Sequence, residues 1–131
     1  MDNERYIDRF NASVSSGVYW LTADEPIPAM RTRINSCNIL EVTAATNGYC
    51  GGDSGHGSRT VISFRDLGST DIQIRKIPEG MSNGGVEILL GGDCELTSIR
   101  EACEFVVYAL DRLIARSERK KKGTAPDDVE E

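Results

Sequence analysis

The segment between residues 47 and 60 has the residue types and spacing in this chain that most favour chemistry. It reads Asn-Gly-Tyr-Cys-Gly-Gly-Asp-Ser-Gly-His-Gly-Ser-Arg-Thr. Glycines let backbone N–H groups approach a ligand closely or form a nest that binds an anion. A loop of about a dozen residues or more in a compact domain is usually functional or disordered. We therefore predict ligand contacts here, with a flexible hairpin loop as the alternative; the predicted contact residues are Gly51, Gly52, Asp53, Ser54, His56 and Arg59.

Catalysis by this segment is disfavoured. The run Gly-Asp-Ser-Gly looks like the surroundings of a serine-protease nucleophile, but His56 is the sole histidine and lies two residues from Ser54, poorly placed to take its proton. No Gly-Lys-Ser/Thr follows, so a Walker phosphate loop is excluded as well. We expect no catalytic residue and no cofactor.

The cysteines argue against a zinc site, because metal sites need closely spaced ligand pairs and this chain has no Cys-x-x-Cys. The interpretation is four reduced thiols, some packed as small hydrophobic residues: Cys37, Cys50, Cys94 and Cys103. We expect no metal.

A second candidate group lies on a predicted C-terminal helix. Glu101, Phe105, Tyr108, Arg112 and Arg116 follow one another at steps of three or four residues, so they share a helix face. Two guanidiniums one turn apart can hold a phosphate, and an aromatic ring can stack on a base. We predict ligand contacts from the two aromatics and the two arginines. The alternatives are core packing or a homodimer contact for the aromatics, and compensation of the helix dipole by the arginines.

Charge is distributed unevenly along the chain of 131 residues, whose formal net charge is −6. Residues 1–111 carry −7, residues 112–122 carry +5 and residues 123–131 carry −4. A protein that binds duplex DNA in general needs a basic face over the whole domain, so that class is disfavoured. No apolar run is long enough for a membrane helix, and the acidic first residues do not resemble a signal peptide. We expect a cytoplasmic protein.

These groups must be positioned by an α+β fold. Strands are predicted at residues 17–22, 38–46, 60–64, 71–77 and 86–90, joined by short turns that imply a mostly antiparallel sheet of four to five strands. Two prolines predict an extended connection over 25–28. A short helix is expected over 2–10. One domain over 1–122 and a flexible acidic tail over 123–131 complete the prediction.

One long helix over about 94–120 is predicted to cover the sheet, with Asp93 as its N-cap. Its core-facing stripe repeats at steps of three to four residues, and consists of Leu96, Ile99, Cys103, Val106, Leu110 and Leu113, with Ala102, Ala109 and Ile114 alongside.

The Gly-rich run of residues 47–60, the run Asp66-Leu67-Gly68-Ser69-Thr70, a last strand ending in Gly91-Gly92-Asp93 and the long helix resemble a group of small phage and prophage proteins. The similarity is to the phage Thoeris anti-defence sponges of the first-described type, over roughly residues 37–118. It implies a homo-oligomer that is not an enzyme and that sequesters cyclic ADP-ribose-type signals, and in some members cyclic oligonucleotides. Arg112 and Arg116 would then be phosphate contacts.

The leading hypothesis is therefore a protein that captures a small anionic nucleotide signal without cleaving it, in a homo-oligomer. Two alternatives stay open. One is an inhibitor of the anti-CRISPR type, which binds a defence complex through the acidic surface of residues 1–111. The other is a small nucleotide hydrolase that uses Asp53 and His56.

Overall fold

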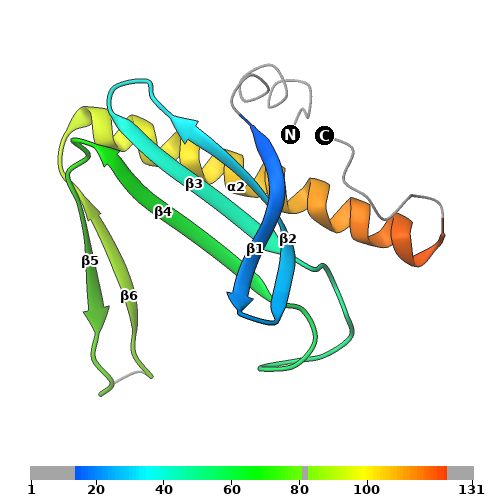
Figure 1. Cartoon of the computed structure of the whole chain (residues 1–131). Helices are drawn as coiled ribbons and strands as arrows, with labels where there is room; N and C mark the ends of the chain where they lie inside the picture. Colours follow the sequence, from blue (N-terminus) through cyan, green and yellow to red (C-terminus); the bar gives the residue numbers. More distant parts are fainter. Residues whose placement is uncertain (1–13, 81–82, 124–131) are drawn as a thin grey trace.

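The computed structural model describes residues 14–80 and 83–123. It confirms the predicted α+β class, a mostly antiparallel fold with one long C-terminal helix (Figure 1). The elements are β1 (Ser15–Thr22), β2 (Glu25–Ile34), β3 (Ile39–Thr46), β4 (Thr60–Gly68), β5 (Ile72–Ile77), β6 (Gly85–Leu90) and α2 (Asp93–Lys121). The helix predicted over 2–10 lies outside the described residues, as does all but the first residue of the predicted tail.

Strands β1 to β4 form one antiparallel sheet in chain order, and β2 was missed by sequence reasoning. Residues 25–28 belong to this strand, so the predicted connection there is wrong. Pro26 pairs with Trp20 and Pro28 pairs with Val18, both on β1. Pairing of β2 with β3 begins only at Ala29. The prolines thus lie where the strand has a neighbour on one side alone, and a missing N–H is tolerated there.

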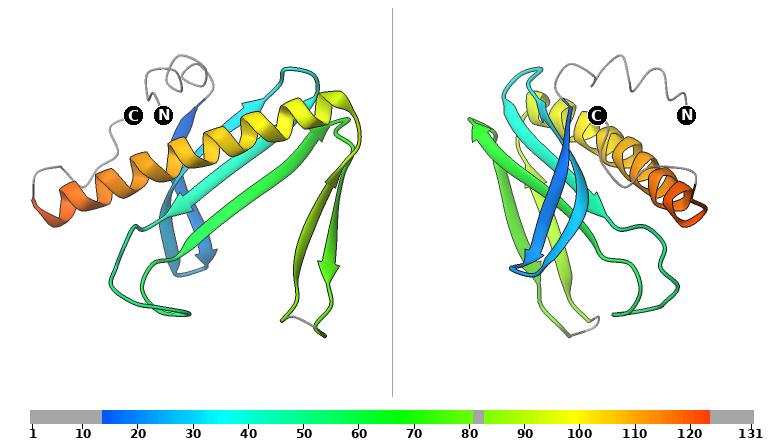
Figure 2. Two further views of the ribbon diagram at one scale, coloured as in Figure 1. Left: turned by 180° about the vertical axis from the view of Figure 1, so that it is seen from behind. Right: turned by 45° about the vertical axis from the view of Figure 1, so that its right-hand side comes forward.

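The helix α2 lies across one face of this sheet, and the main core forms between them (Figure 2). β3 lies at the centre, and every residue from Leu40 to Thr46 is buried. The core joins residues of β2, β3 and α2, namely Met30, Ile34, Leu40, Val42, Ala44, Ala102, Phe105, Val106, Tyr108, Ala109 and Leu113. Burial of this apolar surface fixes the helix against the sheet.

The face of α2 that packs on the sheet agrees with the predicted stripe except at two positions. Val106 and Leu113 belong to the core, and Ile99 and Leu110 are partly buried against it. Leu96 is 60% exposed and Cys103 is exposed as well, so both lie outside the core. Ser98, Ala102 and Ala109 are fully buried, and small side chains at these positions let the helix backbone approach the sheet closely.

The helix begins one residue earlier than predicted, because Gly92 rather than Asp93 is the N-cap. Gly92 has φ 118°, a conformation that residues with a side chain rarely adopt. Asp93 is the first helical residue and makes no side-chain capping bond. Its carboxylate and that of Glu95 still lie in the first turn, where negative charge offsets the helix dipole.

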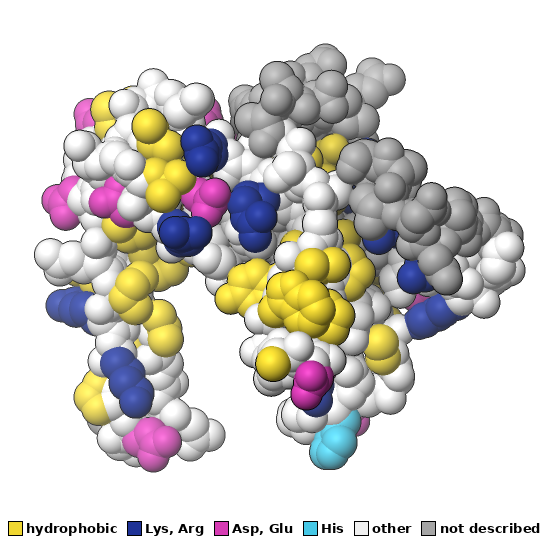
Figure 3. Space-filling model, in the orientation of Figure 1, with side chains coloured by type: hydrophobic (Ala, Val, Ile, Leu, Met, Phe, Trp, Pro, Cys, Tyr) yellow, Lys and Arg dark blue, Asp and Glu magenta, His cyan; other side chains and the backbone are white. Residues whose placement is uncertain are grey.

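Strands β5 and β6 form a separate two-stranded hairpin that projects from the body (Figure 1). Ile74 pairs with Ile88 and Lys76 with Val86, so these side chains share one face. On this face Ile74 is 62% exposed and Val86 is 66% exposed. The space-filling view shows the hairpin standing apart from the rest, with hydrophobic side chains along it (Figure 3).

Candidate functional site

A pocket of about 380 Å³ lies beside the C-terminal end of α2, where the helix passes over β2 and the start of the Gly-rich segment. Its lining residues are Pro28, Asn47, Leu113, Arg116, Ser117, Lys120 and Lys121. Three of the seven are cationic and none is acidic. A pocket of this size and charge fits a small anionic molecule.

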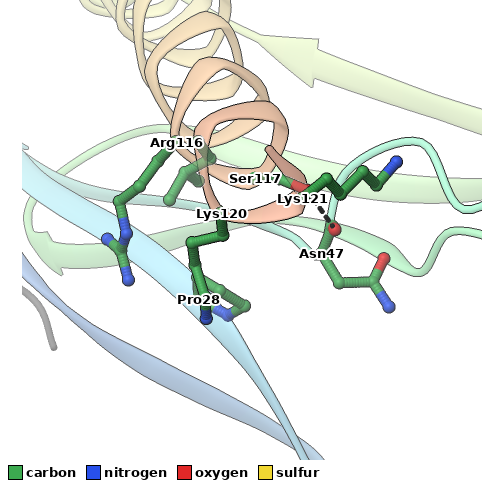
Figure 4. Close-up of a pocket in the computed structure, with 7 residues that line it drawn as sticks. Pro28, Asn47, Arg116, Ser117, Lys120 and Lys121 are labelled. Atoms are coloured by element: carbon green, nitrogen blue, oxygen red, sulfur yellow. Dashed lines mark hydrogen bonds between the residues drawn. The ribbon is translucent and has the colours of Figure 1, made fainter. Parts of the chain in front are cut away.

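The cations of the pocket extend in two directions. Arg116 and Lys120 stand one helical turn apart, and both side chains lie on the side of Pro28 (Figure 4). Lys121 extends the other way, donates a hydrogen bond to the carbonyl oxygen of Tyr49 and lies 3.6 Å from a carboxylate oxygen of Glu118. Arg116 and Lys120 therefore line the pocket on the side of Pro28, whereas Lys121 contacts the loop.

The start of the Gly-rich segment is held against the helix by a hydrogen bond at Asn47 and by the close approach of Gly48. The Ser117 hydroxyl donates to the carbonyl oxygen of Asn47 at 3.2 Å. Gly48 has φ +84°, and a Cβ built on it would lie 2.5 Å from Ser117 Oγ. Only glycine satisfies both the backbone conformation and this contact. The segment thus contributes to the wall of the pocket through its first residue, Asn47.

The rest of the segment is an ordered loop that Arg59 holds from within. The Arg59 guanidinium donates to the carbonyl oxygens of Gly55, Gly57 and Ser58 at 3.2 to 3.5 Å. The backbone N–H of Arg59 donates to Asn47 Oδ1 at 2.8 Å, and this bond closes the neck of the loop. Arg59 therefore acts on its own loop rather than on the pocket.

The loop tip lies apart from the pocket. The predicted contacts at the tip are all exposed and line neither this pocket nor the smaller one on the other flank of the helix; they are Gly51, Gly52, Asp53, Ser54 and His56. The smaller pocket, of about 150 Å³, lies between the loop base and the helix and includes Tyr49, Ser58 and Ile114. The structure thus brings the helix to the base of the Gly-rich segment and not to its polar tip.

Of the predicted helix contacts, one reaches the pocket. Phe105 is fully buried and Tyr108 is 5% exposed, and both belong to the core. The Arg112 guanidinium lies 5.7 Å from the centre of the Tyr108 ring, within the range of a cation–π contact. Arg116 alone lines the pocket. The site proposed below accordingly omits Phe105, Tyr108 and Arg112.

Two residues outside the predicted set bear on the candidate site. Lys120 lines the pocket and continues the step of four residues from Arg112 and Arg116, a signal that was present in the sequence. Trp20 does not line the pocket, but it is 57% exposed and shares a face of the β1–β2 pair with the lining residue Pro28, to which it is a diagonal neighbour. That relation depended on strand β2, so sequence reasoning could not find it.

The four cysteines are unbonded and exposed, which corrects the prediction that some pack in the core. Over residues 14–80 and 83–123 no group of His, Cys, Asp and Glu side chains is arranged to hold a metal ion. Within the same ranges, no helix has the length and apolar character needed to cross a membrane.

No protein-family model matches this chain, and the searches found no similar curated protein and no similar solved structure.

Proposed function

We propose that this protein binds a small anionic nucleotide in the pocket at the end of α2 and sequesters it without cleaving it. The ligand class is that of cyclic ADP-ribose-type immune signals, with cyclic oligonucleotides as related candidates. One observation carries the proposal: Arg116 and Lys120 extend side by side into a pocket of about 380 Å³ that has no acidic lining residue.

Side chains, not the helix backbone, must supply the attraction for the anion. The C-terminal end of a helix carries partial negative charge, which opposes a phosphate. A guanidinium and an ammonium one turn apart overcome this effect, because hydrogen bonds between charged groups are about twice as strong as neutral ones. Ser117 and Asn47 add polar groups at the wall next to the loop.

An aromatic surface beside the cations supports a nucleotide over a simple anion. Trp20 lies two residue pairs along the β1–β2 ribbon from Val18 and Pro28, on the same face. Its ring is 57% exposed, which leaves area on which a base can stack. Base stacking on an aromatic side chain contributes about 1–3 kcal/mol. The phosphate would lie at Arg116 and Lys120, and the base would extend towards Trp20.

The composition of the pocket favours retention over hydrolysis. Its seven lining residues include no carboxylate, imidazole or thiol that could act as a base or nucleophile. The single hydroxyl, on Ser117, donates to the carbonyl oxygen of Asn47. Asp53 and His56, the pair considered for a hydrolase, lie on the loop tip outside the pocket.

The proposed homo-oligomer would form through the β5–β6 hairpin. The helix face first considered for this role is occupied by the core, whereas Ile74 and Val86 on the hairpin are exposed. Between residues 72 and 90 two basic side chains match two acidic ones, so two copies meet there without net repulsion despite the overall charge of −6. A two-fold axis would bring identical apolar faces together.

Calorimetry with purified protein tests the binding site. Cyclic ADP-ribose isomers and cyclic dinucleotides are the ligands, and Arg116→Ala and Lys120→Ala are the test variants. Each loses a charged hydrogen bond, so we expect Kd to rise by about tenfold to a hundredfold. Arg100→Ala, at the exposed other end of the same helix, is the control and should bind as the wild type does.

A second series separates the base from the phosphate. Trp20→Ala should weaken binding of the nucleotides but leave the affinity for a ribose phosphate that lacks a base unchanged. Mass spectrometry after incubation should return each ligand with its mass intact. No heat of binding with any nucleotide, or equal affinities for wild type and Arg116→Ala, contradicts the proposed site, and a changed ligand mass contradicts sequestration.

A further inference from the structure

The turn between β2 and β3 is fastened to the start of α2 by three side-chain hydrogen bonds. The Ser36 hydroxyl donates to Glu101 Oε1 at 2.7 Å. The side chain of Asn38 donates through Nδ2 to Glu95 Oε2 at 3.0 Å and accepts at Oδ1 from the Ser98 hydroxyl at 2.9 Å. These bonds fix residues on both sides of Cys37 against one face of the helix.

Cys94 lies on that same helix face. It precedes Ser98 by one turn and Glu101 by two, and residues at this spacing lie above one another. The row of contacts therefore places Cys37 beside the start of the helix on the side that carries Cys94, and the nearby Cys94 thiol is the first cause of a raised pKa at Cys37. Both side chains are exposed, so a reagent in solution can reach them.

We propose that Cys37 and Cys94 form a reversible intramolecular disulfide when the protein meets a disulfide oxidant of the glutathione type. The three hydrogen bonds of Ser36 and Asn38 hold the β2–β3 turn against the start of α2 before any reaction, and they keep Cys37 close to Cys94. Once one of the two thiols has reacted with glutathione disulfide, the other can attack it within the same molecule, which favours a protein disulfide over a stable glutathione adduct.

The exchange proceeds in two balanced steps. The Cys94 sulfur, as thiolate, attacks one sulfur of glutathione disulfide, a mixed disulfide forms and one glutathione thiolate leaves. The Cys37 thiolate then attacks the Cys94 sulfur and expels the second glutathione thiolate. The two protons lost by the protein pass to the two glutathione molecules.

Cys94 is the thiol expected to attack first. It lies in the first turn of α2, where the positive end of the helix dipole favours a thiolate. The neighbouring Cys94 thiol, followed by burial and by the negative charges of Glu95 and Glu101, raises the pKa of the Cys37 thiol, which suits Cys37 to the resolving role. The result is a covalent link between the β2–β3 turn and the helix start.

The link would reinforce a junction that also holds the hairpin. Glu95 Oε2, which accepts the bond from Asn38, accepts a second one from the backbone N–H of Asp71 at 3.0 Å. Asp71 in turn accepts from Gly91 N across the base of β5 and β6. Oxidation would therefore stiffen the base from which the hairpin projects.

The experiment oxidises the full chain with glutathione disulfide and counts free thiols. We expect a peptide map of the oxidised wild type to show Cys37 joined to Cys94 without glutathione, whereas Cys50 and Cys103 carry glutathione or stay free, and we expect Tm to rise reversibly. Cys37→Ser and Cys94→Ser should each abolish the Tm shift and instead carry one glutathione on the remaining partner. Cys50→Ser and Cys103→Ser are matched controls and should form the link as the wild type does.

Three results would overturn the proposal. They are four intact thiols after oxidation, a stable glutathione adduct on wild-type Cys37 or Cys94, and a link that joins two chains or involves Cys50 or Cys103. Alkylation of the reduced protein under the same conditions is the control. Because all four cysteines are exposed, each should react, which would show that the accessibility of the thiols does not decide which disulfide forms.

Discussion

At the residue scale, the position of the Gly-rich segment depends on Gly48. Two glycines of the segment have nearly the same left-handed backbone, with φ +84° at Gly48 and +75° at Gly51. They differ in their surroundings, since a Cβ at Gly51 meets nothing within 4 Å, whereas one at Gly48 would lie 2.5 Å from Ser117 Oγ. Gly48 therefore has a structural role that Gly51 lacks.

Alanine substitutions at these two positions separate the energetic cost of backbone strain from the cost of the close contact with Ser117. Gly51→Ala introduces only the left-handed strain, which costs about 1 kcal/mol of the free energy of unfolding. Gly48→Ala adds overpacking against Ser117, and the total should be about 2–4 kcal/mol. Urea denaturation measures both. Equal losses at the two positions would show that the contact with the helix does not hold the loop.

Sequence reasoning singled out the Gly-rich loop, but most of its predicted contact residues lie outside the pocket. Glycine content marked residues 47–59 as unusual, and in the structure the carbonyl oxygen of Asn47, at the start of this segment, accepts a hydrogen bond from Ser117 near the end of α2. The polar residues of the tip were predicted as ligand contacts, but which of them reach a pocket depends on how the loop folds. Arg59 is an example, because its guanidinium donates to carbonyl oxygens of its own loop, and these partners come within reach only in the folded loop.

At the element scale, α2 was predicted with nearly correct bounds, and its sheet-facing side was predicted correctly except at Leu96 and Cys103, which are exposed. Length and periodicity define where a helix runs. Its rotation is decided by side-chain size, because Ala102 and Ala109 are fully buried at the closest approach to the sheet. Strand β2 was missed because its prolines were taken to exclude a strand. Proline excludes pairing with a neighbour on both sides, but a segment that pairs on one side alone can still be a strand.

The close approach of α2 can be tested with one substitution at two sites. Ala109→Leu inserts three carbons where the helix meets the sheet, and should lower the free energy of unfolding by about 1–3 kcal/mol. Ala115→Leu makes the same change on an exposed position of the same helix and should stay within about 0.5 kcal/mol of the wild type. Thermal and urea denaturation give both values. A neutral Ala109→Leu would mean that the helix packs less tightly than described.

At the scale of the whole molecule, the β5–β6 hairpin is the element with the least support from its own chain. A two-stranded hairpin alone is marginally stable in water. One of its faces carries Arg75 and Glu87, joined by an ion pair at 3.0 Å, with Gln73 beside them. The opposite face presents Ile74 and Val86 to solvent. This amphipathic pattern is typical of a surface that a second copy covers.

Arginine at neighbouring positions tests which face forms the contact. Ile74 and Gln73 point to opposite faces of β5, so the same new charge enters the apolar face in Ile74→Arg and the charged face in Gln73→Arg. In light-scattering measurements of molar mass, the wild type and Gln73→Arg should run as a homo-oligomer, and Ile74→Arg should run as a monomer. Circular dichroism checks that both variants keep the fold. A wild type that stays monomeric at every concentration, or an Ile74→Arg variant of unchanged mass, would show that the hairpin face serves another partner.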